Sequence, residues 1–180
     1  MLRKTRAAAL AAALSITGSL AATAAADAKL RMPFKCGVKV NGEVRANHDP
    51  PNAIDFNGLG GGDTDLGWPI VAAGRGVITI SQYYTSNGYG NAIEIRHPSG
   101  ARTFYAHLQV RRFAVGKHVR QGQRIGRLGK SSAKYTFTAH LHYEQRNASG
   151  SAVQARFNGK VAAPYFNREN PTLMRSHNGC

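Results

Sequence analysis

The stretch NAIEIRHPSGARTFYAHLQV, residues 91–110, carries the pattern that decides the fold. Two short runs rich in β-branched and aromatic residues, 91–97 and 101–110, flank the turn-forming residues HPSG at 97–100. Short runs of this kind, separated by Pro, Ser and Gly, are typical of antiparallel strands joined by a hairpin turn. The stretch therefore predicts a β-hairpin.

Runs of the same kind occur on both sides of this hairpin. We predict a strand in each of WPIVAAGRGVITISQYY (68–84), QRIGRLG (123–129) and AHLHYEQR (139–146), and a Gly-rich loop in NGYGN (87–91). No segment after the N-terminal 26 residues has the period of a convincing amphipathic helix, and there is no internal repeat or low-complexity linker. The expected class is all-β, an antiparallel sheet or sandwich with few or no helices.

The N-terminal segment has the composition of a secretory signal peptide. Three basic residues precede an apolar, Ala-rich run, and Ala24 and Ala26 form an A-x-A cleavage site. The alternative is a membrane anchor, which Gly18 and the lack of a basic stop-transfer flank disfavour. We expect residues 1–26 to be a signal peptide and residues 27–180 to form one secreted domain, extracellular or associated with the cell wall.

The two cysteines, Cys36 and Cys180, lie at opposite ends of that domain. In an exported protein such a pair is expected to form one disulfide that ties the termini together. Two free thiols or an intermolecular link are the alternatives.

The chain is strongly basic, with a formal net charge of +15. Removing Arg3, Lys4 and Arg6 with the signal peptide lowers this by three, to +12. Such an excess favours anionic partners, which outside a cell include cell-wall polymers. The basic residues are dispersed, without a nucleic-acid motif, so we expect no specific nucleic-acid partner and no membrane span.

A pair of histidines in the run 139–146 raises the question of a metal site. Because side chains alternate along a strand, His140, His142 and Glu144 should share one face, and Leu141 and Tyr143 the other. Taken alone, two alternating histidines on a strand are as compatible with surface decoration as with metal binding.

A third ligand could come from NHDPPNAIDFNG, residues 47–58, where His48 and Asp55 bracket a Pro-Pro turn. Zinc binds imidazole and carboxylate together, and a catalytic zinc keeps three protein ligands and one open position. Asp49 is a rival ligand, although an Asp before Pro commonly starts a turn.

Five segments in this order resemble the lysostaphin-like, or beta-lytic, zinc metallopeptidases, and in particular their small secreted actinobacterial members. They are HDPPNAIDF (48–56), GWPIVAAGRGVI (67–78), YGNAIEIRHPSGARTFYAHL (89–108), VGKHVRQGQRIGRLG (115–129) and HLHYE (140–144). The resemblance implies an all-β fold with a duplicated hybrid motif, whose loops form a substrate groove. It also implies one zinc ion per chain, a monomer, and hydrolysis of peptide bonds in bacterial peptidoglycan.

The resemblance also implies roles for single residues. His48, Asp55 and His142 would be the zinc ligands, and His140 and His107 would face the substrate. We assign His140 as general base and His107 as the group that stabilises the transition state, with the reverse assignment left open.

Other residues near these motifs have weaker indications. Tyr105 lies two positions before His107, so it either lines the substrate groove or packs as a half-buried tyrosine. Glu144 is expected to orient an imidazole rather than to act as a base. We expect three further histidines to be exposed: His97, His118 and His177.

The chain departs from the family pattern in two places. Six residues separate His48 from Asp55 where the family has three, and SSAKYTFTA (131–139) replaces the usual Gly-rich segment before the paired histidines. The first departure bears on metal binding and the second on specificity.

Three other functions compete with a peptidase. A degenerate member of the family would bind wall peptides or activate a hydrolase, but it would typically lack a zinc ligand. A lipoyl-like carrier is suggested by VGKHVRQGQRIG (115–126), and it is disfavoured because no modified-lysine turn is recognisable. A basic nucleic-acid binder is supported by charge alone.

Overall fold

The computed structural model describes residues 29–44, 48–162 and 172–180. These segments form fourteen strands in three sheets, and no helix occurs among them. The all-β prediction is therefore confirmed. The expected signal peptide, residues 1–26, lies outside the described residues.

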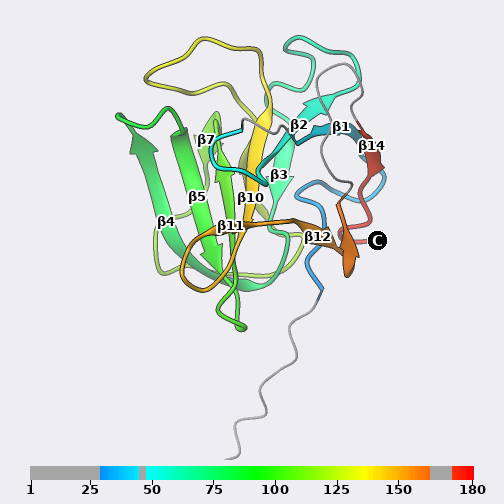
Figure 1. Ribbon diagram of the computed structural model, residues 1–180, viewed down its shortest axis with the longest axis vertical. Helices are drawn as coiled ribbons and strands as arrows, with labels where there is room; N and C mark the ends of the chain where they lie inside the picture. The colour runs from blue at the N-terminus through cyan, green and yellow to red at the C-terminus, as the bar shows by residue number, and fades with distance from the viewer. Residues whose placement is uncertain (1–28, 45–47, 163–171) are drawn as a thin grey trace, which may run out of the picture.

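A nine-stranded antiparallel sheet crosses the whole molecule, from β4 at the left to β14 at the right in Figure 1. Strand β10 lies near its centre, between β2 and β6. Along the sheet the strands are β14 (Thr172–Arg175), β1 (Lys39–Glu43), β2 (Ile54–Gly58), β10 (Leu141–Arg146), β6 (Arg102–Ala106), β5 (Gly90–Arg96), β4 (Gly76–Tyr84) and β8 (His118–Val119), with β11 (Ala152–Val153) paired to β10.

Two smaller sheets complete the fold. One has the strands β3 (Pro69–Val71), β9 (Arg124–Arg127) and β7 (Val110–Arg111), and the other pairs β12 (Arg156–Phe157) with β13 (Lys160–Val161). One face of the large sheet and the three-stranded sheet share a hydrophobic core. Its members include Ile70, Ile93, Ile95, Ile125, Leu141 and Tyr143. The opposite face of the large sheet, called the polar face below, carries buried charged groups such as Glu94 and Glu144 beside a smaller apolar cluster of Ala92, Phe104 and Ala106.

The hairpin predicted at 91–110 is confirmed, since β5 and β6 pair antiparallel on either side of the turn. Two of the predicted strands are each divided between sheets. Residues 68–84 form β3 and β4, which are separated by a bend at 73–75. Residues 101–110 form β6 and the start of β7, because His107 adopts a positive φ of 58° that ends the extended conformation.

The prediction that His97 is exposed was wrong. His97 continues the alternation of Ile93 and Ile95 and points to the core side of the sheet, where it is buried. Its ring bonds the Arg75 carbonyl at 2.8 Å and the Thr103 hydroxyl at 2.9 Å, which satisfies both nitrogens. The other two histidines expected to be exposed, His118 and His177, are exposed.

The two ends of the described chain are joined covalently and by strand pairing. Cys36 and Cys180 form a disulfide with a Cα–Cα distance of 5.3 Å, and β14 pairs with β1. Within the described segments there is also no helix long and apolar enough to cross a membrane.

Candidate metal centre

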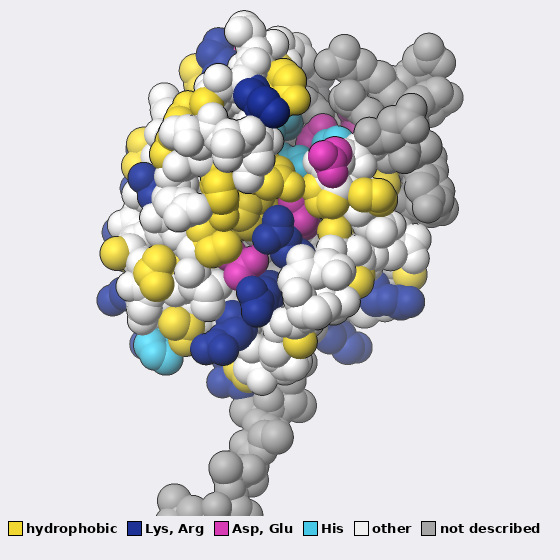
Figure 2. Space-filling view, turned by 60° about the vertical axis from the view of Figure 1, so that its left-hand side comes forward, with side chains coloured by type: hydrophobic (Ala, Val, Ile, Leu, Met, Phe, Trp, Pro, Cys, Tyr) yellow, Lys and Arg dark blue, Asp and Glu magenta, His cyan; other side chains and the backbone are white. Residues whose placement is uncertain are grey.

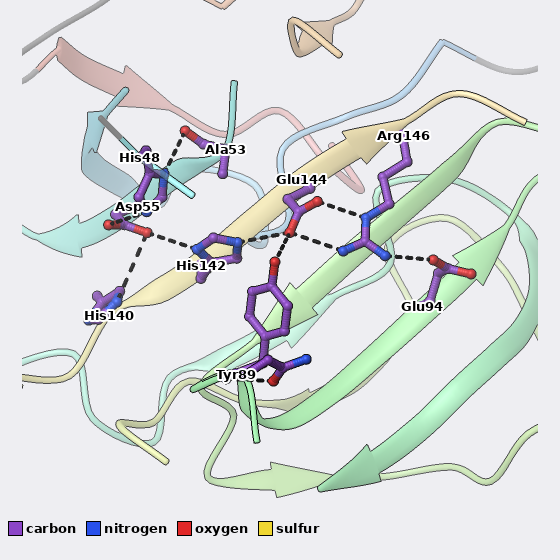
Figure 3. Close-up of polar contacts among 10 residues, drawn as sticks. His48, Ala53, Asp55, Tyr89, Glu94, His140, His142, Glu144 and Arg146 are labelled. Atoms are coloured by element: carbon purple, nitrogen blue, oxygen red, sulfur yellow. Dashed lines mark hydrogen bonds and ion pairs between the residues drawn. The ribbon is translucent and has the colours of Figure 1, made fainter. Parts of the chain in front are cut away.

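Three side chains with metal-binding atoms converge where β2 and β10 lie side by side. Asp55 and His142 are direct cross-strand partners, so their side chains leave the sheet on the same face. His142 Nδ1 lies 3.3 Å from Asp55 Oδ1, and His48 Nε2 lies 3.2 Å from Asp55 Oδ2. One ligand atom from each residue lies within 4.8 Å of the others (Figure 3).

The unusual spacing of His48 and Asp55 does not separate them. The intervening residues turn back on themselves through a cis Asp49–Pro50 bond and a positive φ at Asn52, and the Ala53 amide donates to the Pro50 carbonyl. The longer segment is thus taken up by the turn.

The arrangement of donors fits a metal ion. His48 can donate from Nδ1 to the Ala53 carbonyl, and His142 from Nε2 to Glu144, which leaves one ring nitrogen of each facing Asp55 (Figure 3). Asp55 Oδ1 is buried without a hydrogen-bond partner. Ligand atoms about 2.1 Å from a tetrahedral zinc lie about 3.4 Å apart, close to the two separations to Asp55.

Charges in this cluster are strongly coupled. Burial alone would raise the pKa of the Asp55 carboxyl, but the close imidazoles of His142 and His48 outweigh it and hold that pKa well below its usual value. Burial alone would lower the pKa of His142, but Asp55 and Glu144 raise it to about 9. Because metal ions displace protons from their ligands, a bound cation would replace the proton held here.

Two further imidazoles, His107 and His140, lie beside the three candidate ligands. Their ring centroids are 4.7 Å apart, and His140 Nε2 is 4.0 Å from Asp55 Oδ1. His107 Nδ1 bonds the Ser131 carbonyl at 3.0 Å, and His140 Nδ1 bonds the Thr138 carbonyl at 2.9 Å. Since a carbonyl only accepts, each Nδ1 carries a proton, and in the neutral form of each ring the lone pair lies on Nε2.

The environment of His107 favours the neutral ring. Burial, together with the nearby charges of His140 and His142, lowers its pKa to about 3. A neutral His107 that donates from Nδ1 is a hydrogen-bond acceptor at Nε2. This differs from the donor role expected for His107 from the sequence, because His107 and His140 then both offer an accepting Nε2 to the site.

A pocket of about 350 Å³ opens over these groups. Its walls come from the segment around β1 and the loop before β2, from the loop between β4 and β5, and from the loop before β10. The lining residues are Glu43, His48, Asp49, Asp55, Asn57, Asn87, Gly88, Tyr89, His107, Tyr135, Phe137, Thr138, His140 and His142. All five histidine and aspartate residues expected at the site therefore face one cavity.

Tyr105 does not face this pocket, so its placement in the substrate groove was wrong. The side chain is fully buried in the core, where its hydroxyl accepts from the Ala73 amide at 2.9 Å and bonds Thr103 at 2.9 Å. The expectation assumed that strand alternation continues to His107. The positive φ of His107 breaks that alternation, so Tyr105 and His107 point to opposite sides of the sheet.

Three aromatic residues that line the pocket, Tyr89, Tyr135 and Phe137, were missed in the sequence, and two of them contact its histidines. The Tyr89 ring lies 5.2 Å from that of His142, and the Phe137 ring lies 4.5 Å from His107 and 4.8 Å from His140. Tyr89 belongs to the Gly-rich loop at 87–91, and Phe137 to the segment 131–139 that departs from the family pattern. Both loops were identified, but neither ring carried a signal of its own.

The comparisons with known proteins place the chain in a family. The model for Peptidase family M23 matches residues 61–155. This range contains His107, His140 and His142, whereas His48 and Asp55 precede it. The assignment of those two as ligands therefore depends on the geometry of the site.

Two curated proteins are similar over part of the chain. The peptidoglycan DD-endopeptidase ShyC of Vibrio cholerae is 47% identical over 79 residues, and the DD-carboxypeptidase/endopeptidase Mpg of Neisseria meningitidis is 46% identical over 80 residues. Each match covers 44% of this chain and 17% of the relative. The chain thus spans about a sixth of the length of these relatives.

Among solved structures, the fold is similar to that of pseudoalterin, described as an M23 metalloprotease from the deep sea. The TM-score is 0.60 with 22% sequence identity, and the match covers 84% of this chain and 95% of the other.

Proposed function

Because the chain belongs to peptidase family M23, we propose that it is a zinc metalloendopeptidase that cuts peptide bonds in bacterial peptidoglycan. Both curated relatives are named as endopeptidases, and the name of the Vibrio cholerae protein, a peptidoglycan DD-endopeptidase, supports this substrate. The observation that carries the proposal is the convergence of His48, Asp55 and His142, beside His107 and His140, on one pocket.

Zinc is the metal that suits this donor set best. Two imidazole nitrogens and one carboxylate oxygen form a set that zinc binds in tetrahedral geometry, with one position left for water. Bound there, zinc would supply Lewis acidity and a water whose pKa is near neutral. We propose one zinc ion per chain, held by His48 Nε2, Asp55 and His142 Nδ1.

Two side chains of the protein, His140 and His107, are placed to accept and donate the protons of the reaction. His140 Nε2 points toward Asp55 with its lone pair free, so we assign His140 as the group that accepts a proton from the attacking water. His107, neutral and accepting at Nε2, can hold the same water in line or share its proton. A ring that has gained a proton can donate it to the leaving amine.

Phe137 packs against both imidazoles and limits the water around them. In a less aqueous surrounding the hydrogen bonds of the two histidines are stronger. The loop 131–139 that carries Phe137 would border the bound peptide, so we expect it to influence which bond is cut.

Secretion and retention at the cell wall are further parts of the proposal. They rest on the signal-peptide pattern at 1–26 and on the net charge. A groove of about 520 Å³ offers a place for an anionic wall polymer, because Arg75, Arg96, His118 and Arg120 line it and none of the described lining residues is acidic. It lies at the end of β5 remote from Tyr89.

On the face of the molecule turned forward in Figure 2, Lys and Arg side chains gather over the lower half. Histidine and acidic side chains lie in the hollow above them. Interactions between exposed charges weaken as salt is added. We therefore expect retention on purified walls to fall with salt, and to fall further for Arg96→Gln/Arg120→Gln. Retention that is insensitive to both would contradict a role for the charge.

The peptidase activity is tested by digesting purified peptidoglycan and identifying the released peptides by mass spectrometry. The protein should release peptides with new termini, and a chelator or His142→Ala should abolish the release. The exposed His177 provides the control, since His177→Ala removes a histidine that lines neither the pocket nor the basic groove and should leave cleavage intact. A zinc-loaded protein that binds walls and releases no peptide would indicate a binding role instead.

A further inference from the structure

A chain of charged side chains continues from the candidate ligand His142 across the polar face of the large sheet. His142, Glu144 and Arg146 alternate along β10 and therefore point to the same face. Glu144 Oε1 accepts from His142 Nε2 at 3.0 Å, and its Oε2 accepts from Arg146 Nε at 2.7 Å. Arg146 Nη2 donates a further bond to Oε1 at 3.1 Å, so the guanidinium holds both oxygens of Glu144 (Figure 3).

Arg146 is fixed from its other side as well. Its Nη1 donates to Glu94 Oε2 at 3.0 Å, and its guanidinium carbon lies 4.0 Å from the centre of the Phe104 ring. In the sheet, Phe104 is the direct partner of both Glu144 and Glu94. Arg146 thus bridges two carboxylates across the ring that separates them.

Glu94 is itself held in place by two donors on the strands beside it. Arg102 Nη1 lies 3.2 Å from Glu94 Oε1, and the Thr79 hydroxyl donates to the same oxygen at 2.8 Å. The orientation of Arg146 is therefore set by β4, β5 and β6 as well as by its own strand.

This network is costly to build. Glu94 and Glu144 are each only 1% exposed, in a chain with nine acidic residues in all. Buried ion pairs pay a large desolvation cost and often contribute little or nothing to net stability. Stability alone is therefore a weak reason for two buried carboxylates at this place, and their link to His142 points to another one.

The link fixes the direction of the His142 ring. With Nε2 donating to Glu144, Nδ1 faces Asp55 and the proposed metal position. A carboxylate held at both oxygens cannot rotate away from the imidazole without breaking the bonds to Arg146. Partners of this kind, beyond the ligands themselves, set ligand orientation and metal affinity in other metal sites.

We propose that Arg146 and Glu94 are positioning residues of the metal centre, which act through Glu144 to hold the His142 imidazole with Nδ1 toward the metal. This inference rests on the proposed zinc site. It extends the expected role of Glu144 to two residues that touch neither the metal ligands nor the pocket.

The test compares zinc affinity in three variants by competition with a chelator at constant pH. Arg146→Gln removes the bidentate hydrogen bonding of the guanidinium to Glu144. Arg146→Lys keeps the positive charge but cannot form the bidentate contact. Arg127→Gln, on β9, is the control, because Arg127 Nη1 bonds the Gly67 carbonyl and the substitution removes the same charge elsewhere. We expect zinc binding to weaken about 10- to 100-fold for Arg146→Gln, to a lesser extent for Arg146→Lys, and not for Arg127→Gln.

A second readout separates positioning from a general structural effect. In the zinc-loaded protein, the Nε2 proton of His142 should exchange slowly with water and be visible by NMR, and in Arg146→Gln it should exchange faster. If Arg146→Gln fails to fold, Glu94→Gln gives the decisive comparison, since it neutralises the carboxylate on the far side of Arg146 while leaving Glu144 and His142 in place, and it should lower zinc affinity severalfold.

A folded Arg146→Gln that binds zinc within twofold of the parent protein and retains a slowly exchanging Nε2 proton would overturn the inference. For Glu94→Gln, unchanged zinc affinity would do the same. Failure of the proposed function has a different signature, because the unsubstituted protein would then bind no zinc at all.

Discussion

The replacement of His107 by asparagine should make the folded protein less sensitive to mild acid. His107 has a pKa of about 3 in the folded state, lowered chiefly by burial, against an ordinary value near 6.5. Protons therefore bind the unfolded chain more readily, and the stability that the neutral ring contributes is present above pH 6.5 and is lost as the pH falls below it. Asparagine tolerates the positive φ of 58° at this position and does not titrate.

The size of the effect follows from the two pKa values. Linkage gives about 1.4 kcal/mol per pH unit once the unfolded histidine is mostly protonated, which amounts to about 2 kcal/mol between pH 7 and pH 5. Urea unfolding at these two pH values, with a chelator present so that metal release does not contribute, measures it. We expect the parent protein to lose about 2 kcal/mol more than His107→Asn over this interval. The exposed His118→Asn is the control. Equal losses for the parent and His107→Asn would show that His107 is charged or accessible to water, and would refute the neutral acceptor role.

Three further predictions concern the framework around the site. Tyr105→Phe should lower the free energy of unfolding by about 1 to 3 kcal/mol, because it leaves the buried Ala73 amide unbonded, and it should leave peptide release unchanged; a selective loss of cleavage would restore Tyr105 to the groove. Gly90→Ala should strongly destabilise the protein, since Gly90 has a φ of 60° and a Cβ there would overlap the Ser131 carbonyl; a thermal midpoint within 1 or 2 °C of the parent would contradict this. Replacing both Cys36 and Cys180 by serine should cost up to about 5 kcal/mol in denaturant unfolding, because the disulfide closes a loop of 144 residues, and an unchanged midpoint would show that the link contributes nothing.

The parts of the fold that follow a simple period could be predicted from the sequence. The hairpin at 91–110 and the division of faces along β10 both follow from strand alternation, and both occur in the structure. His142 and Glu144 share the polar face, while Leu141 and Tyr143 enter the core.

The predictions of side-chain position and strand extent were wrong where a residue or a short bend interrupts the alternation of side chains along a strand, or where a strand continues beyond its expected end. The positive φ of His107 reversed the expected side of Tyr105, and the bend at 73–75 divided one predicted strand between two sheets. His97 was assigned to the turn, although it continues the buried face of β5 by one more residue. Local composition does not reveal such changes of direction.

The candidate metal ligands could be proposed from the sequence through the family resemblance. That their side chains lie close together in the folded protein could not be derived from it. His48 and Asp55 approach each other through a turn with a cis peptide bond, and Asp55 meets His142 only through the pairing of β2 with β10. The contact of Arg146 with Glu94 reaches across one intervening strand, β6, and joins residues 52 positions apart in the chain. No periodicity within one segment specifies contacts of this range.

The central claim is that one metal ion is held by His48, Asp55 and His142. The most direct measurement is an anomalous difference map at the zinc absorption edge, from crystals of the protein grown with zinc. The account predicts one strong peak within about 2.2 Å of His48 Nε2, an Asp55 oxygen and His142 Nδ1. A peak at other residues, or a fully ordered site without zinc at saturating concentration, would contradict it.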